Sequence, residues 1–263
     1  MASRVITLLT DFGLRDPYVA EMKGVILNIC PSVNIVDISH DIEKFNIRMG
    51  SYVLASSSPY FPKGTINVAV VDPGVGTERR GLCVETERGF FVGPDNGLLA
   101  LAVRAQKVKH IYVIENREFL LSSVSPTFHG RDVFAPVGAH LARGTDASDF
   151  GPKTRKMIIP TFAKVISCDN KITGEVINVD GFGNVITNIT EKDLESFGDT
   201  KELGVKVGRR EMRLRFCEAY GNVGVGRPLA LVGGHGFLEI SVNQGDASKV
   251  FGLKGEDKIT VCL

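Results

Sequence analysis

The stretch Thr65-Ile66-Asn67-Val68-Ala69-Val70-Val71-Asp72-Pro73-Gly74 decides the fold class of this 263-residue chain. β-Branched and apolar residues fill almost every position of 65–71, which predicts a strand buried on both faces, as in a parallel sheet. Asp72 follows at the carboxyl end of that strand, and the next residues predict a turn. Ligands of open α/β sheets bind at this edge, so Asp72 is a candidate functional residue.

Strands and helices alternate around this strand, which predicts an α/β amino-terminal domain with a mainly parallel sheet over residues 1–155. The other expected strands are 4–9, 33–38, 81–93 as a hairpin-like pair, and 110–115. Asp16 is expected to cap the first helix, which has Pro17 in its first position and ends near Pro31. The further expected helices are 47–57, 96–105 and 131–143, the last ended by Gly144.

The character of the sequence changes beyond a boundary expected at about residues 150–165. Short β-like runs separated by turn residues occupy 174–179, 184–189, 204–207, 228–232, 238–242 and 258–261. This spacing predicts a smaller all-β carboxyl-terminal domain over residues 163–263, either a barrel or a sandwich.

Composition narrows the class of ligand. The chain has 31 basic and 30 acidic residues, so nothing favours nucleic acid or a charged membrane surface, and a small molecule is the expected partner. The amino terminus lacks a signal-peptide pattern, and no apolar run reaches about 18 residues, which indicates a cytoplasmic protein. The five cysteines lack a C-x-x-C spacing and are expected to be reduced core thiols: Cys30, Cys83, Cys168, Cys217 and Cys262.

Asp11 and His129 are two further candidates in the first domain. Asp11 follows the first strand and should share a sheet edge with Asp72, where a carboxylate suits the paired hydroxyls of a ribose. The alternative is that Asp11 and Asp16 cap the turn and the helix. His129 lies beside glycine at the start of a helix, whose exposed amides favour anions, although a lone histidine is more often structural.

Other charged residues near His129 have simpler interpretations. Asp132 is expected to be a helix cap, and Arg131 a solvated or helix-packing charge. In the second domain, the segment 180–188 combines an aromatic residue, Phe182, that could stack on a planar ring with an amide, Asn184, that could pair with a purine edge. The alternative for this segment is a tight β-turn.

Six short motifs, in this order, resemble those of the S-adenosyl-L-methionine hydroxide adenosyltransferase family, the water-using relatives of fluorinating and chlorinating enzymes. They are Thr10-Asp11-Phe12-Gly13, Asp72-Pro73-Gly74-Val75-Gly76-Thr77, Gly93-Pro94-Asp95-Asn96-Gly97, Phe128-His129-Gly130-Arg131-Asp132, Phe182-Gly183-Asn184-Val185 with Thr187-Asn188, and Val242-Asn243-Gln244-Gly245. The resemblance implies a homotrimer with active sites between the amino domain of one subunit and the carboxyl domain of the next.

The resemblance also implies roles for individual residues. The catalytic set is Asp72, Arg79 and His129, with Arg79 favoured over Arg80 by its spacing. The implied substrate contacts are Asp11 for the ribose, Phe182 and Asn184 for the adenine, Asp180 for the methionine amine, and in addition Asp16, Phe45, Phe128, Gly234 and Asn243. Many relatives have serine where this chain has Gly233-Gly234-His235-Gly236, so backbone amides would have to replace the side-chain contact to the methionine carboxylate.

The implied reaction is attack of water on C5′ of S-adenosyl-L-methionine, giving adenosine and L-methionine without a metal or a cofactor. One hypothesis is that Asp72 and His129 share the proton while Arg79 orients the water. Two alternatives are a metal-dependent hydrolase of a nucleoside or phosphate substrate, using Asp11, Asp72, His129 and Asp132, and a non-catalytic protein that binds adenosine or S-adenosyl-L-methionine.

Overall fold

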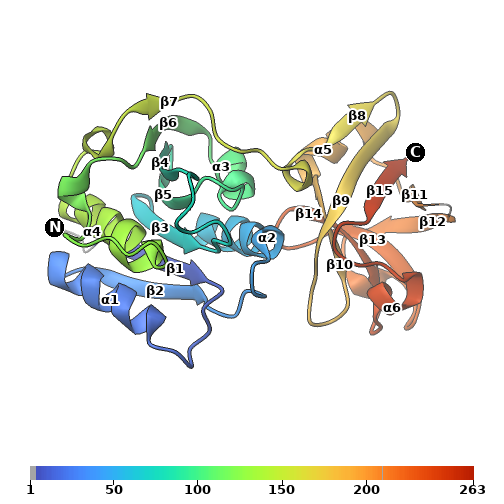
Figure 1. Cartoon of the computed structure of the whole chain (residues 1–263). Coiled ribbons are helices and arrows are strands. Elements are labelled where there is room, and N and C mark those ends of the chain that lie inside the picture. Colours follow the sequence, from blue (N-terminus) through green and yellow to red (C-terminus); the bar gives the residue numbers. More distant parts are fainter. Residues whose placement is uncertain (1–3, 209) are drawn as a thin grey trace. The chain divides into compact units, whose positions relative to one another are not determined.

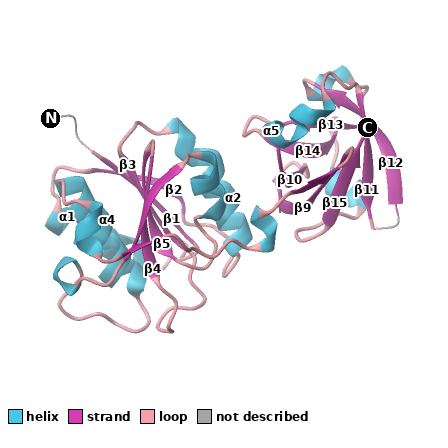
Figure 2. Ribbon diagram, turned by 90° about the horizontal axis from the view of Figure 1, so that it is seen from above, coloured by secondary structure: helices cyan, strands magenta, loops and turns pink. Residues whose placement is uncertain are grey.

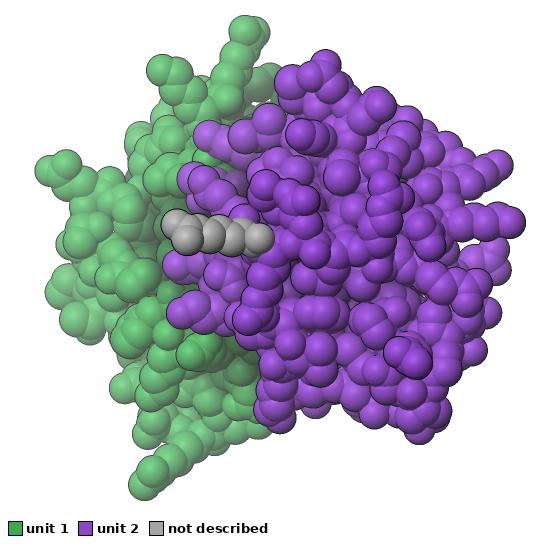
Figure 3. Space-filling view, turned by 90° about the vertical axis from the view of Figure 1, so that its right-hand side faces the viewer, with its two compact units in different colours: residues 1–160 green, residues 161–263 purple. Residues whose placement is uncertain are grey.

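The computed structural model describes residues 4–208 and 210–263. The chain divides into two compact units, residues 1–160 and residues 161–263 (Figure 1, Figure 3). Each unit has its own hydrophobic core, and each is described separately below.

The first unit contains one seven-stranded sheet, which confirms the α/β class. In spatial order its strands are β2 (Asn34–Ser39), β1 (Val5–Thr10), β3 (Thr65–Val70), β5 (Gly89–Pro94), β4 (Gly81–Thr86), β6 (Val108–Val113) and β7 (Lys153–Thr154). The first four are parallel, and the pairs from β5 to β7 are antiparallel. The change of direction occurs at the β4–β5 hairpin, because a two-residue connection can join only antiparallel strands.

Helices cover both faces of this sheet. Helices α1 (Tyr18–Ile29) and α4 (Ala135–Arg143) lie on one side, and α2 (Ile47–Ser57) lies on the other, where α3 (Ala100–Ala105) packs against it (Figure 2). Gly144, with φ of 104°, ends α4 as predicted. Helix α3 starts later than expected because Asn96 instead forms a turn, in which its side chain donates to Val71 O and accepts from Leu98 N.

Two predicted helix caps are wrong. Pro17, not Asp16, occupies the N-cap position of α1, and no side chain caps that end; Asp16 lines the cavity described below. Asp132 lies inside a single π-helical turn, Gly130–Phe134, that precedes α4. Its carboxylate accepts from Ser125 N and from Arg131, and therefore fixes a loop rather than a helix end.

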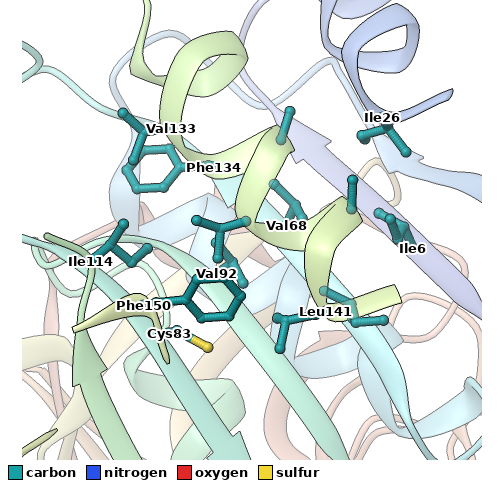
Figure 4. Close-up of a cluster of buried hydrophobic side chains, with 14 of the residues drawn as sticks. Ile6, Ile26, Val68, Cys83, Val92, Ile114, Val133, Phe134, Leu141 and Phe150 are labelled. Carbon is teal, nitrogen blue, oxygen red and sulfur yellow. The ribbon is translucent and has the colours of Figure 1, made fainter. Parts of the chain in front are cut away.

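The core of the first unit lies between the sheet and the helices α1 and α4 (Figure 4). Phe134 and Phe150 are fully buried there, beside strand residues such as Ile6, Val68 and Val92. Burial of one such large apolar side chain stabilises the fold by about 1.5–3 kcal/mol. The shared core thereby fixes the positions of the carboxyl ends of β1 and β3 relative to each other.

Close packing of α4 on β3 leads to a stability prediction. A Cβ atom at Gly138 would lie 2.6 Å from Cγ2 of Val68, a fully buried strand residue. We expect Gly138→Ala to lower the free energy of unfolding by about 1–3 kcal/mol through overpacking, despite the higher helix propensity of alanine. Urea unfolding measures this, with Gly24→Ala in α1 as the control, because nothing lies within 4 Å of that Cβ. Equal stability of the two variants would contradict the packing argument.

The second unit is a closed barrel of seven strands, which confirms the barrel alternative. Around the barrel these are β10 (Val185–Thr190), β14 (Phe237–Val242), β13 (Pro228–Val232), β12 (Arg210–Cys217), β11 (Glu202–Val207), β15 (Lys258–Cys262) and β9 (Lys171–Val179). Pairing of β9 with β10 closes the circle, and β8 (Ile166–Cys168) extends β9 at its outer edge. Short helices α5 (Glu191–Leu194) and α6 (Ala247–Phe251) lie in the connections.

The five cysteines are free, but only two of them are core residues. Cys30 and Cys83 are buried, whereas Cys168 is exposed and Cys217 and Cys262 are half-buried, so the expectation of five core thiols is wrong. Burial raises the pKa of Cys83, which keeps its thiol protonated and unreactive. Among the helices of residues 4–208 and 210–263, none combines the length and apolar character that crossing a membrane requires.

Candidate active site

A cavity of about 550 Å³ opens at the carboxyl ends of β1 and β3 in the first unit. These strands are parallel neighbours, with Thr10 opposite Val70, so Asp11 and Asp72 emerge at the same sheet edge as predicted. Six predicted site residues line the cavity: Asp11, Asp16, Phe45, Asp72, Phe128 and His129.

The chain after β3 turns back so that Arg79 meets Asp72. Arg79 Nε donates to Asp72 Oδ1 over 2.9 Å, and Nη2 of the same guanidinium donates to Oδ2. Both side chains are largely buried, at 11% and 5% exposure, so this is a fork-shaped ion pair with little solvent screening. The neighbouring Arg80 instead pairs with Asp95. Arg79 is therefore the arginine that faces Asp72.

Gly76 makes this turn possible. Its φ is 77°, and a Cβ atom at this position would lie 2.3 Å from the carbonyl oxygen of Pro126. Only glycine combines the left-handed backbone with such close approach. The turn after Asp72 is thus packed directly against the loop that leads to His129.

Arg79 also contacts His129, and this contact fixes the state of the imidazole. Arg79 Nη2 lies 2.8 Å from His129 Nδ1. Because a guanidinium only donates hydrogen bonds, Nδ1 must accept, which places the proton of the neutral ring on Nε2. Burial and then the charge of Arg79 lower the pKa of His129, against opposing effects of Asp72 and Asp132. His129 is therefore neutral near pH 7, and Arg79 lies between it and Asp72.

The loop that carries His129 is held by a second ion-pair network. Asp132 is fully buried and accepts from Ser125 N over 2.8 Å and from Arg131 Nε over 2.6 Å. Arg131 in turn donates to Glu21 on α1, and its guanidinium lies 4.8 Å from the centroid of the Phe128 ring. Arg131 is thus fixed between charged and aromatic partners, which contradicts the solvated interpretation and agrees with the helix-packing one, because Glu21 lies on α1.

Aromatic side chains form one wall of the cavity. The rings of Phe12, Tyr18 and Phe128 meet edge to face, with centroid separations of 5.2 to 5.8 Å. Phe45 is 67% exposed and has φ of 66°, and its N–H donates to Asp11 Oδ2 over 2.9 Å. Tyr18 and Lys44 also line the cavity and were not predicted. Tyr18 directly follows Pro17, the N-cap residue of α1, which is the one sequence signal for its placement.

The remaining predicted contacts lie in the second unit. Asp180 Oδ1 accepts from the N–H groups of Phe182 and Asn184, and its Oδ2 accepts from the Asn184 side-chain amide, each over 2.9 Å. This is the tight turn that the sequence allowed, and it leaves Phe182 83% exposed. Asn243 is buried and donates to Val223 O, whereas Gly234 is exposed.

Most of the donor atoms that the sequence offers to a metal ion are paired with arginine side chains. Both oxygens of Asp72 and Nδ1 of His129 are bound to the cationic Arg79, and the carboxylate of Asp132 is bound to Arg131. A divalent cation would have to displace these guanidinium groups. In the part of the chain that the structure describes, no group of three or more His, Cys, Asp or Glu side chains could hold a metal ion.

The whole chain is similar to one group of proteins. Residues 6–151 match the family described as SAM hydroxide adenosyltransferase N-terminal domain, and residues 174–260 match the corresponding C-terminal domain. The (R)-S-adenosyl-L-methionine hydrolases of Thermus thermophilus and Methanocaldococcus jannaschii are 38% and 37% identical, with 95% and 98% of this chain and 96% and 95% of those proteins covered. A fluorinase of an Actinoplanes species is 26% identical, with 98% and 97% covered.

Solved structures agree with this similarity. An uncharacterized conserved protein from Thermotoga maritima superimposes with a TM-score of 0.87 at 42% sequence identity, covering 98% of this chain and 100% of that one. A conserved hypothetical protein from Thermus thermophilus gives a TM-score of 0.79 at 35% identity, with 98% and 99% covered.

Proposed function

Because the chain belongs to the SAM hydroxide adenosyltransferase family, we propose that it hydrolyses S-adenosyl-L-methionine to adenosine and L-methionine. The observation that carries the proposal is the contact of Arg79 with both Asp72 and His129 at the edge of a cavity large enough for a nucleoside. The identity of 36–38% to curated hydrolases, against 26–27% to fluorinases, favours water over halide as the nucleophile.

The proposed reaction forms a C5′–O bond as the C5′–S bond breaks. The electron pair of the C–S bond moves to the sulfonium sulfur, L-methionine leaves as a neutral thioether, and one proton of water is released. Full deprotonation of water by an ordinary carboxylate beforehand would cost roughly 16 kcal/mol, because their pKa values differ by about 12 units. Two routes reduce this cost: the proton leaves the water as the C–O bond forms, or Arg79 and His129 stabilise a hydroxide-like nucleophile electrostatically.

The geometry suggests how the three residues divide this work. A carboxylate offers about four acceptor positions, and Arg79 uses two of those on Asp72, so Asp72 retains capacity to accept the proton of the water. His129 carries its proton on Nε2, so this N–H can donate a hydrogen bond to the water oxygen. That hydrogen bond would orient a lone pair of the water toward C5′. Arg79 lies between the two, so it fixes both side chains and replaces the direct Asp72–His129 proton sharing that the sequence suggested.

The other predicted residues are proposed to bind substrate. Asp11 is proposed to accept the ribose hydroxyls, and it lines the same cavity as Asp16, Phe45 and Phe128. We further propose that a neighbouring subunit of a homotrimer supplies Asp180, Phe182, Asn184, Gly234 and Asn243. Phe45, which lines the cavity, and Phe182 are both mostly exposed, so each ring is accessible to a ligand held between two subunits. The five free cysteines support a cytoplasmic location.

Incubation of the protein with S-adenosyl-L-methionine in ¹⁸O-water tests the proposal. We expect adenosine with one ¹⁸O atom in its 5′-hydroxyl, detected by mass spectrometry, and L-methionine without label. The same rate should be found after exhaustive EDTA treatment, whereas loss of activity restored by a divalent ion would favour the metal-dependent hydrolase. Ligand that is bound tightly yet recovered intact after hours would identify a binding protein instead.

A further inference from the structure

A buried chain of side chains lies beneath the proposed ribose site. Thr10 is the last residue of β1, and its Oγ1 lies 2.8 Å from Nδ1 of His40, which directly follows β2. On the other side of the ring, Nε2 of His40 lies 3.1 Å from Asp37 Oδ1, off the line of a well-directed hydrogen bond. Thr10 is fully buried and His40 is 4% exposed. The proposed reaction uses none of these three residues.

Two backbone contacts connect this chain to the turn that contains Asp11. The carbonyl oxygen of His40 accepts the N–H of Gly13 over 2.8 Å, and Thr10 Oγ1 accepts the N–H of Phe12 over 3.2 Å. His40 therefore holds the turn at both of its ends, through its ring at Thr10 and through its backbone at Gly13. Gly13 has φ of 71°, so the turn is closed by a left-handed residue that glycine favours.

The contacts also set the hydrogen-bond directions along the chain. The His40 nitrogen that faces the Asp37 carboxylate is the one that carries the proton, because a bare nitrogen there would meet a negative charge. In the neutral ring Nδ1 then accepts, so the Thr10 hydroxyl donates to it. Lys23 Nζ lies 2.6 Å from Asp37 Oδ2. Burial raises the pKa of Asp37, but its contacts with Lys23 and His40 outweigh this effect, so the pKa of Asp37 is lowered. The ionised Asp37 thus anchors the ring.

A hydroxyl, an imidazole and a carboxylate in series are also the groups of a nucleophilic triad. That role does not fit here, because the Thr10 hydroxyl is fully buried and is not among the groups that line the cavity. Its neighbour Asp11 is the residue that reaches the cavity. We infer that His40 is a positioning residue, which acts through Thr10 to hold the Asp11 carboxylate where it can accept the hydroxyls of a ribose. The inference rests on the ribose contact in the proposed function.

Asp11 depends on this support because few other contacts fix it. Its Oδ2 accepts the N–H of Phe45, a residue that is itself mostly exposed. A shift of the turn at Thr10 would move the carboxylate relative to that N–H and to any bound ribose. Hydrogen bonds to an ionised group are worth more than neutral ones, so even a small displacement should be measurable as lost affinity.

Calorimetric binding of adenosine and of 2′,3′-dideoxyadenosine to the full-length protein tests the inference. We expect His40→Ala and Thr10→Val each to weaken adenosine about tenfold while leaving dideoxyadenosine within about twofold. The double variant should lose no more than either single variant, because both break one connection. The control is His140→Ala on α4, where the half-buried ring packs against Phe119 away from the cavity; it should change neither affinity.

Several outcomes would overturn the inference. Adenosine affinity unchanged in His40→Ala would do so, as would an equal loss for both nucleosides, which indicates general damage to the cavity. A wild-type protein that does not discriminate between the nucleosides would remove the ribose contact on which the inference depends. Failure of the proposed function is separate: a wild-type protein that forms no adenosine from S-adenosyl-L-methionine yet shows the hydroxyl-specific loss would keep the role of His40 and refute the hydrolase.

Discussion

Replacing Asp72 with asparagine should lower kcat/KM for hydrolysis of S-adenosyl-L-methionine by about three to four orders of magnitude. Asparagine keeps the shape of the side chain but cannot accept the proton of the attacking water. It also leaves the charge of Arg79 unbalanced close to a sulfonium substrate, so repulsion should add to the loss of the base. Steady-state kinetics of adenosine formation, with circular dichroism to confirm folding, measures the effect.

The chain provides a matched control for this variant. Asp95 is also a buried carboxylate paired with an arginine, Arg80, and in addition accepts the N–H of Ile158, but it is not among the residues that line the cavity. Asp95→Asn should therefore lower the thermal unfolding midpoint while leaving kcat/KM within about threefold for the folded protein. A similar loss of activity in both variants would mean that Asp72 acts only as a structural ion-pair partner.

Much of the fold could be predicted from the sequence because its signals are local. The apolar run 65–71 and the periodic apolar positions of α1 are each decided within a few residues. Strand β12 was missed although Met212, Leu214 and Phe216 alternate with charged residues, because the charges dominate that segment. The order of strands, with β5 between β3 and β4, depends on long-range pairing that no local pattern encodes.

The site residues also differ in how far local sequence signals predict them. Asp11 and Asp72 could be placed together because the carboxyl ends of parallel strands share one edge. The contact of Arg79 with His129 joins residues 50 positions apart, so only the folded chain reveals it. Asp16 was misassigned because Pro17 takes the N-cap position itself. The role of Asp132 was missed because it lies inside a π-helical turn and accepts from Ser125, which lies in the preceding irregular loop. The roles of the residues in catalysis and binding stay predictions.

His129→Asn should reduce kcat by about two to four orders of magnitude, because the Nε2–H donor that is proposed to orient the water is lost. The asparagine side-chain oxygen can still accept from Arg79, so the variant separates loss of that donor from collapse of the Asp72–Arg79 pair. Adenosine formation at saturating substrate measures kcat, and His140→Ala serves as the control, since that half-buried histidine lies away from the cavity. Undiminished turnover in His129→Asn would remove this residue from the mechanism.

The pH profile gives an independent test of the same residue. Burial and Arg79 lower the pKa of His129, so the active neutral form persists below the ordinary histidine value of about 6.5. Protonation of His129 would place a proton on Nδ1, the atom that accepts from Arg79, and would put two positive charges in contact. We therefore expect kcat/KM to be level above pH 6.5 and to fall at lower pH. Folding stability has the same sign: a pKa lowered in the folded state contributes stability that is lost as pH falls below about 6.5. In His129→Asn the fall of kcat/KM at low pH should disappear or move to another pH. An unchanged profile would mean that a group other than His129 causes the fall; Asp72 and Asp132 are the carboxylates whose charges act on His129.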